Sequence, residues 1–345
     1  MSKTQNVPAR YVALLVRYLE QEGTDCAAAL AETGISRDSL RHTDAQLPTE
    51  QITSVTRLLT EASGGRRDLG LNIGAMLSPG QMGELGLAML NCATIKDSLE
   101  LCARYYALVT PSFAMRTSLK GALFEVVWQP IQAVPYDLLV MAYDIALMTF
   151  HTRMKMLLRD EMPGYDIYLF SPEPPDRDRY KALKPARCYF GQGGLPSLRI
   201  TIDADVVKRT PMPMAHAGDL ADIERRLAQR LLHHARQDQR DWKAWVTMML
   251  TEAHGDQPTQ DELADIVGLS TSTLARHLAA QGTSFRELAN HVRHERACMW
   301  LRDGRLQVSD VASLLGYTHA ANFIRAFKAR AGVSPTRYAA QHSQP

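Results

Sequence analysis

The sequence is poor in cysteine, and its cysteines form no recognisable pattern. There are five among 345 residues, an odd number, and no two stand in a CxxC pair. A disulfide framework draws on an even set of cysteines, and a structural zinc site draws on closely spaced ones. We therefore expect neither, and we expect the protein to work in the reducing cytoplasm.

Long hydrophobic runs are also missing. The most apolar stretch, DLLVMAYDIALMTFHTRMKMLL, is interrupted by Asp144, His151, Arg153 and Lys155. A membrane-spanning helix needs about 20 predominantly apolar residues, so this stretch predicts a buried amphipathic helix. The first residues, MSKTQNVPARYVALL, contain no apolar run and no cleavage site of signal-peptide type. The sequence thus predicts neither membrane association nor export.

The common motifs of enzymes and cofactor-binding proteins are absent too. GQMGELG has glycines three positions apart instead of the GxGxxG spacing of a dinucleotide site. GTSF does not extend to a GxSxG nucleophile motif, HVRHE does not have HExxH spacing, and His233 and His234 are adjacent and face different sides of a helix. We expect no catalytic activity, no cofactor and no metal.

Charge of one sign does not dominate, because the net charge of the whole chain is +2. From Gln257 onward, however, there are ten Lys and Arg against seven Asp and Glu, and the remainder of the chain is slightly acidic. This asymmetry permits nucleic-acid binding by the last quarter of the chain. An ordinary solvated surface with a few extra arginines explains it equally well.

The pattern of apolar residues in the first 235 positions predicts an α+β domain. Short amphipathic helices come first, including one that begins at a capping box, TIKD over residues 94–97. FAMRTSLKGALFEVVW then reads as a hairpin that turns at Lys120 and Gly121. A long helix is expected from about Pro135 to Arg159, followed by strands at YDIYLF and SLRITI, on either side of a proline-rich connection.

A short pattern occurs twice near the end of the chain, as ADIVGLSTSTLARHL and again as ASLLGYTHAANFIRAF. In the first copy, Thr259 and Glu262 form a capping box that starts a helix, Gly268 ends it, and Ser270 caps the next helix. This is the pattern of a helix-turn-helix, although packed helix pairs with glycine turns also occur in proteins that bind no DNA. Two copies joined by one long helix, SFRELANHVRHERACMWLRD, favour an all-α domain of two helix-turn-helix motifs.

These residues carry a resemblance to a known family. The segment from about 258 to 341 resembles the DNA-binding domain of AraC/XylS-type bacterial transcription regulators, with Gly316, Phe323, Phe327, Gly332, Pro335 and Tyr338 in the family's order. The stretch GELGLAMLNCATIKDSLELCARYYAL resembles, more weakly, the arabinose-binding-type N-terminal domain of one branch of these regulators. The resemblance implies a regulatory domain over 1–235, a linker with a helical segment over 236–257 and a DNA-binding domain over 258–345.

By the family pattern, the second helix of each motif lies in the major groove of double-stranded DNA. The residues expected to face the bases are Ser272, Ala275, Arg276, Ala321, Asn322, Ile324 and Arg325. Those expected at the DNA backbone are Arg302, Lys328 and Arg330. The two base-facing arginines could read guanine or merely contact phosphate, and the small and aliphatic positions suggest contacts to thymine methyl groups or to DNA shape.

The resemblance also implies that the N-terminal domain binds a small-molecule effector and that the DNA-bound protein contacts RNA polymerase. An aromatic and apolar set with one positive charge suits a small carboxylate or an amphiphile: Arg104, Tyr105, Tyr106, Phe113, Trp128 and Met141. Ordinary core packing beside a surface arginine is the alternative for each of these residues. The alternative for the whole chain is a homodimer whose N-terminal domain binds a protein partner instead of a metabolite.

Overall fold

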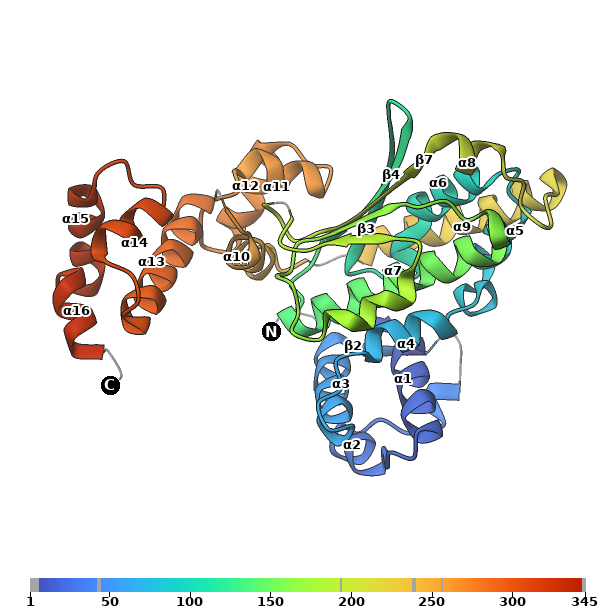
Figure 1. Ribbon diagram of the computed structural model, residues 1–345, viewed down its shortest axis with the longest axis horizontal. Helices are drawn as coiled ribbons and strands as arrows, with labels where there is room; N and C mark the ends of the chain where they lie inside the picture. Colours follow the sequence, from blue (N-terminus) through green and yellow to red (C-terminus); the bar gives the residue numbers. More distant parts are fainter. Residues whose placement is uncertain (1–5, 42–44, 193, 238–239, 256, 343–345) are drawn as a thin grey trace. The chain divides into compact units, whose positions relative to one another are not determined.

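The computed structural model describes residues 6–41, 45–192, 194–237, 240–255 and 257–342. The chain divides into two compact units, residues 1–241 and 242–345, and Figure 1 labels their helices and strands. No helix among the described residues is long and apolar enough to cross a membrane.

The first unit contains a five-stranded sheet with the order β3-β4-β7-β5-β6. Its strands are β3 (Phe113–Lys120), β4 (Leu123–Pro130), β5 (Asp166–Leu169), β6 (Arg187–Tyr189) and β7 (Leu198–Asp203). β5 and β6 are parallel, and the other neighbours are antiparallel. Along β4, Phe124, Val126 and Trp128 alternate onto the buried face, as expected of a strand with one side on the core.

Helices cover this sheet and form a second, separate core. The helices of the first unit are α1 (Arg10–Gln21), α2 (Ala27–Glu32), α3 (Thr49–Ala62), α4 (Leu69–Met76), α5 (Glu84–Asn91), α6 (Ile95–Tyr105), α7 (Tyr136–Leu158), α8 (Ala204–Arg209) and α9 (Ala217–Gln237). A two-stranded sheet, β1 (Asn6–Pro8) with β2 (Gln46–Pro48), accompanies α1–α3. One core joins the large sheet to α5–α7 and α9, and the other joins α1–α4.

Helix α7 lies between these two cores, with the strands on one side and α1–α4 on the other (Figure 1). Its buried Leu139 and Leu147 pack into the sheet core, whereas Met141 and Ile145 contact the core of α1–α4. Gly74 of α4 permits the close approach, because a Cβ there would lie 2.5 Å from the Ile145 carbonyl oxygen. The long apolar stretch is therefore a helix buried on two sides.

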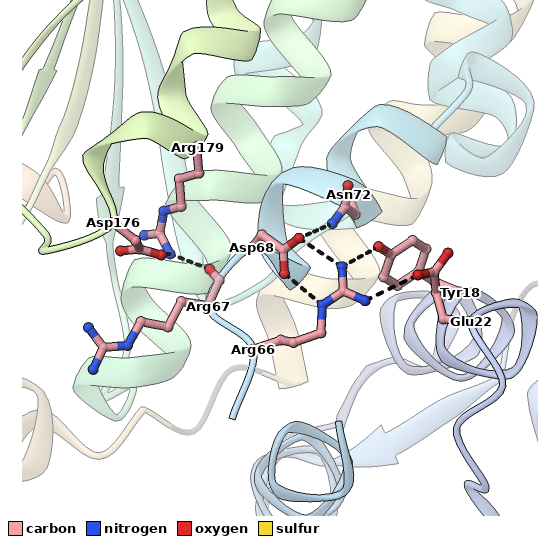
Figure 2. A network of polar contacts seen from close by, with 8 residues as sticks. All are labelled: Tyr18, Glu22, Arg66, Arg67, Asp68, Asn72, Asp176 and Arg179. Atoms are coloured by element: carbon pink, nitrogen blue, oxygen red, sulfur yellow. Dashed lines mark hydrogen bonds and ion pairs between the residues drawn. The ribbon is translucent and has the colours of Figure 1, made fainter. Parts of the chain in front are cut away.

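A polar network fixes the start of α4 (Figure 2). Arg66 donates hydrogen bonds to both oxygens of Asp68, at 2.9 and 2.7 Å, and to the hydroxyl of Tyr18 on α1 at 2.6 Å. The Arg66 guanidinium holds the pKa of the Asp68 carboxyl below its usual value. Arg179 donates to the backbone carbonyl of Arg67. The loop before α4 is thus tied both to α1 and to the segment after β5.

The second unit is entirely helical over its described residues. Its helices are α10 (Trp242–Glu252), α11 (Gln260–Ile266), α12 (Thr271–Ala280), α13 (Phe285–Asp303), α14 (Val308–Leu314), α15 (Ala320–Ala331) and α16 (Pro335–His342). α11 pairs with α12 and α14 pairs with α15, and α13 connects the two pairs. Together with the sheet of the first unit, this arrangement confirms the α+β domain and the all-α domain that the sequence predicts.

The helical segment expected inside the 236–257 linker is α10, and it packs against α12 and α13 of the second unit. Its Trp245, Val246, Met249 and Leu250 are buried. Arg296 of α13 donates to the carbonyl oxygens of Leu250, Thr251 and Ala253 at distances of 2.6–2.9 Å. Because the last carbonyls of a helix have no partner within it, this arginine satisfies the end of α10.

Candidate DNA interface and ligand cavity

The first recognition helix, α12, begins at Ser270, whose side chain accepts a hydrogen bond from the backbone N–H of Thr273. Gly268, in the turn before it, has a φ of +67°, a left-handed conformation that glycine adopts without steric cost. Leu274 and Leu278 are fully buried. The three residues predicted to read bases are exposed: Ser272, Ala275 and Arg276.

The second recognition helix, α15, shows the same separation of faces. Phe323 and Phe327 are buried on one side. The four predicted base-reading residues are exposed on the other: Ala321, Asn322, Ile324 and Arg325. Arg325 donates to the side-chain carbonyl of Asn322 at 2.6 Å. One N–H of Arg325 is therefore engaged within the helix, while its guanidinium keeps further donors.

The three residues predicted at the DNA backbone are all exposed. Arg302, near the end of α13, donates to the Tyr338 hydroxyl at 3.2 Å. Arg330 contacts Nδ1 of His291 at 2.9 Å. Both side chains keep further N–H groups, since a guanidinium carries five donors. Lys328 is exposed on α15, one residue after the buried Phe327.

The residues predicted to bind an effector separate into two groups. Tyr106 and Trp128 line both of two adjoining cavities, of about 90 and about 140 Å³, and Phe113 and Met141 line the larger one. Arg104 lies elsewhere, exposed, with its guanidinium 2.7 Å from Glu224 of α9. Tyr105 is buried in the sheet core and lines neither cavity. The positive charge of the predicted set is therefore not part of either cavity.

Two other arginines supply positive charge to the smaller cavity, which we call the Arg153 cavity. It lies among α1, the segment 77–82, α5, α6 and α7, and its charged lining residues are Arg10 and Arg153. Arg10 donates to the carbonyl of Gln81 at 2.6 Å. The contacts of Arg153 are two thioether sulfurs, Met82 Sδ at 2.8 Å and Met89 Sδ at 3.8 Å.

Sequence reasoning missed both arginines as ligand-binding residues. Arg153 interrupts the most apolar stretch of the chain, and this interruption served only to exclude a membrane span. A charged residue inside an apolar helix that is buried on two sides is itself a signal, because such residues are rarely buried without a partner. For Arg10, next to the start of α1, the sequence gives no comparable signal.

The thiol and phenol groups near Arg153 are uncharged at neutral pH. Burial raises the pKa of the Cys102 thiol to about 11, and it raises the pKa of Tyr11 and Tyr106 above that of an exposed tyrosine. Burial also lowers the pKa of Arg153, although a guanidinium stays protonated at any physiological pH. The cavity therefore holds positive charge without a compensating negative one.

Among the described residues, no group of three or more His, Cys, Asp or Glu side chains is placed to hold a metal ion.

Comparison with known proteins gives a consistent result for both units. Residues 23–210 match the family model for the arabinose-binding domain of AraC transcription regulator, N-terminal, and residues 263–341 match a helix-turn-helix domain model. The ornithine utilization regulator of Pseudomonas aeruginosa is 23% identical over 96% of each chain. An uncharacterized HTH-type transcriptional regulator of Mycobacterium tuberculosis is 28% identical over 96% of this chain and 95% of its own.

Among solved structures, that of the transcriptional regulator CdpR from Pseudomonas aeruginosa is similar, with a TM-score of 0.43 and 19% identity over 91% of this chain and 96% of that chain.

Proposed function

Since this chain belongs to the AraC family of DNA-binding transcription regulators, with an arabinose-binding-type N-terminal domain and a helix-turn-helix C-terminal domain, we propose that a small effector held in the N-terminal domain controls how the two recognition helices use DNA. The family is one of regulators and not of enzymes. Such a protein acts in the cytoplasm, where the bacterial chromosome lies.

The exposed faces of α12 and α15 support reading of DNA by both modules. Each helix buries one apolar stripe and leaves the predicted base-facing residues in solvent. A recognition helix fits the major groove, and successive major-groove faces lie roughly 34 Å apart along B-DNA. Helix α13 has 19 residues and therefore spans about 28 Å at 1.5 Å per residue. A connecting helix of this length is comparable with the spacing of two adjacent turns of one duplex.

The observation that carries effector control is the physical connection between the Arg153 cavity and α9, the last helix of the first unit. Pro79 and Met82 of the short 3₁₀ helix η2 (Pro79–Met82) line the cavity. A Cβ on Gly86 of α5 would lie 1.7 Å from the Pro79 carbonyl oxygen, so η2 and α5 are in backbone contact. A ligand that shifts η2 therefore also shifts α5.

Helix α5 is in turn attached to α9. Glu84, at the start of α5, accepts from Arg226 at 2.7 Å and from Arg230 at 3.2 Å. These guanidinium groups hold the pKa of the Glu84 carboxyl below its usual value. Ile223 and Leu227 of α9 are buried against the sheet core. Because α9 ends at Gln237, five residues before α10 begins, displacement of α9 acts directly on the chain that enters the second unit.

DNA recognition is tested by selecting genomic fragments with the full-length protein at near-physiological salt, because phosphate contacts dominate binding at low salt. We expect enrichment of a bipartite motif with its halves about one helical turn apart. Enrichment of a single half-site would show that only one module reads DNA. Retention of fragments without any common sequence would contradict base reading altogether.

Effector control is tested with a panel of organic acids, amino acids and sugars. A true ligand at 100 times its dissociation constant should stabilise the protein by about 2.7 kcal/mol, and it should change the affinity for the selected DNA. Glu84→Gln should keep DNA binding but weaken this change. Glu61→Gln, which removes an exposed ion pair with Arg57 on α3, is the matched control. If no compound both stabilises the protein and alters DNA binding, effector control is wrong.

A further inference from the structure

We infer that the Arg153 cavity binds a monocarboxylate with an apolar body, and that the guanidinium of Arg153 holds the carboxylate. This inference rests on the proposed effector control, and it names the chemical class of the effector and the residue that selects it.

The first argument is that Arg153 has no charge partner. Among the described residues, no carboxylate lines the cavity or acts on the charge of Arg153, and its Nε has no hydrogen-bond acceptor. The two methionine sulfurs that it contacts are weak acceptors. Arg153 is partly buried, and a charge even partly withdrawn from water without a partner is destabilising, so proteins rarely retain one unless a ligand or a partner completes it.

The second argument is that the cavity wall cannot supply the missing negative charge. Its hydroxyl and thiol groups near Arg153 belong to Tyr11, Tyr106 and Cys102, and they are neutral at physiological pH. No Asp or Glu lines the cavity. The negative charge must therefore come with the ligand, and a ligand that also carries an ammonium group would find no carboxylate in the lining to pair with it.

The third argument concerns the rest of the ligand. Apart from its two arginines and a few hydroxyl groups, the cavity is lined by aliphatic, aromatic and sulfur-containing side chains. Met82, Met89, Met115, Met154 and Met156 are among them, and methionine adapts its shape to varied apolar groups. An apolar body buried here gains about 25 cal/mol per Å² removed from water.

A carboxylate also fits better than a phosphate. A phosphate monoester carries up to two negative charges and three acceptor oxygens at neutral pH. Arg10 gives one of its N–H groups to the Gln81 carbonyl, whereas the hydrogen-bond contacts of Arg153 are to sulfur alone. One guanidinium binds one carboxylate through two parallel hydrogen bonds, so a single arginine matches both oxygens and the single charge of the carboxylate.

The test is isothermal titration of the full-length protein with octanoate, benzoate and phenylacetate, each beside its matched alcohol, and with ornithine. At least one carboxylate should bind, and it should bind ten times or more tightly than its alcohol, because hydrogen bonds to charged groups are the stronger ones. Arg153→Gln should remove this preference. Lys155→Gln, an exposed position on the same helix, is the matched control and should leave it intact.

Folding is checked in the same variants without ligand. Arg153→Met replaces an uncompensated charge by an apolar side chain, so we expect its melting temperature to equal or exceed that of the wild type. Loss of the folded state in both Arg153 variants would show that the arginine is structural and would overturn the inference. The inference would also be overturned if the wild type bound carboxylates and alcohols equally, or if it bound none of the three carboxylates. A third contrary result would be tight binding of ornithine whose affinity is the same in the wild type and in Arg153→Gln.

The failure of this inference is distinguishable from failure of effector control. If another class of compound stabilises the protein and changes its DNA affinity, effector control stands and the assignment to carboxylates is wrong. If a carboxylate binds through Arg153 but leaves the affinity for the selected DNA unchanged, the site stands and effector control is wrong.

Discussion

The two helix-turn-helix modules share one backbone plan but are stabilised by different chemistry. In the first module, α11 and α12, the recognition helix has a serine cap and an aliphatic buried face that includes Leu274 and Leu278. In the second, α14 and α15, the residue before the recognition helix is His319, which makes no side-chain cap. There the core is aromatic, with ring centroids of Phe323 and Phe327 5.7 Å apart.

The exposed faces of the two recognition helices also differ, in the contacts that their arginines make. Arg276 of the first module makes no hydrogen bond or ion pair with any described residue, so its five donors are available to DNA. Arg325 of the second module is already bonded to Asn322. The predicted base-reading arginine of the first module is therefore unengaged, whereas that of the second module already gives one of its five N–H donors to Asn322.

The largest expected effect concerns the aromatic core. Phe327→Ala should destabilise the second module by about 3–5 kcal/mol, because it deletes a buried ring that contacts both Phe323 and Tyr338. Hydrogen exchange of the α15 amides measures this loss, and the α12 amides should keep their protection. Ala326→Ser, on the exposed side of α15, is the control. Equal loss of protection in both modules would mean that they unfold as one unit.

The next effect concerns DNA. Arg276→Ala should weaken binding to the selected site by about 1–3 kcal/mol, the usual value of a bidentate base contact. Arg325→Ala should cost less, because the wild-type side chain must give up Asn322 in order to bind. Lys328→Ala should weaken selected and random DNA alike. Anisotropy titrations at fixed salt measure all three, and equal losses on both kinds of DNA for every variant would refute base reading.

The caps of the two recognition helices should give a smaller effect, on the stability of the first turn of each helix. Ser270→Ala should destabilise the start of α12 by about 1 kcal/mol, since it removes the acceptor for the Thr273 N–H. His319→Ser should act in the opposite direction on α15, because the backbone at His319 already has the extended conformation of a cap. Exchange of the first-turn amides of each helix reports the change. No gain in α15 would show that the end of this helix is limited by something other than its cap.

The smallest expected effect is a pH dependence of the second module. Burial, with the positive charge of Arg330 nearby, lowers the pKa of His294, whose ring packs on Phe327 with centroids 5.0 Å apart. The unfolded chain therefore binds this proton at higher pH than the folded one does. Stability is fully present above the ordinary histidine pKa of about 6.5 and falls as the pH drops below it.

This pH dependence is measured by α15 exchange between pH 7.5 and 5.5, with the intrinsic exchange rates corrected for pH. His294→Gln should flatten the profile. A profile that is equally steep in this variant would assign the dependence to another group.

Much of the architecture could be predicted because its signals are local. The capping box of Thr259 and Glu262, the hairpin turn at Gly121 and the apolar spacing of α7 each involve residues close in sequence. The pairing of β1 with β2 and the parallel pairing of β5 with β6 did not emerge, because strands of three or four residues carry too little periodicity and pair with partners about 20 residues or more away.

The two candidate sites also differ in how far the sequence predicts them. The residues expected to face DNA on α12 and α15 come from the resemblance to the family, and the structure places them on the exposed faces of these helices. The Arg153 cavity depends instead on which elements meet around α7, and its lining comes from residues between Arg10 and Met212. The composition of residues 104–106, an arginine and two tyrosines, favours ligand binding, but Arg104 donates to Glu224 on the surface.

The length of helix α13 also sets the rotation of α15 relative to α12. Each residue of an α-helix advances about 1.5 Å and turns by about 100°, so one residue inserted into α13 would rotate α15 to another side of the duplex while hardly changing its distance from α12. Gly304, with a φ of +69°, ends the helix at a fixed point. If both helices read one duplex, as we propose, the exposed residues of α12 and α15 can change one at a time, whereas the length of α13 must be kept.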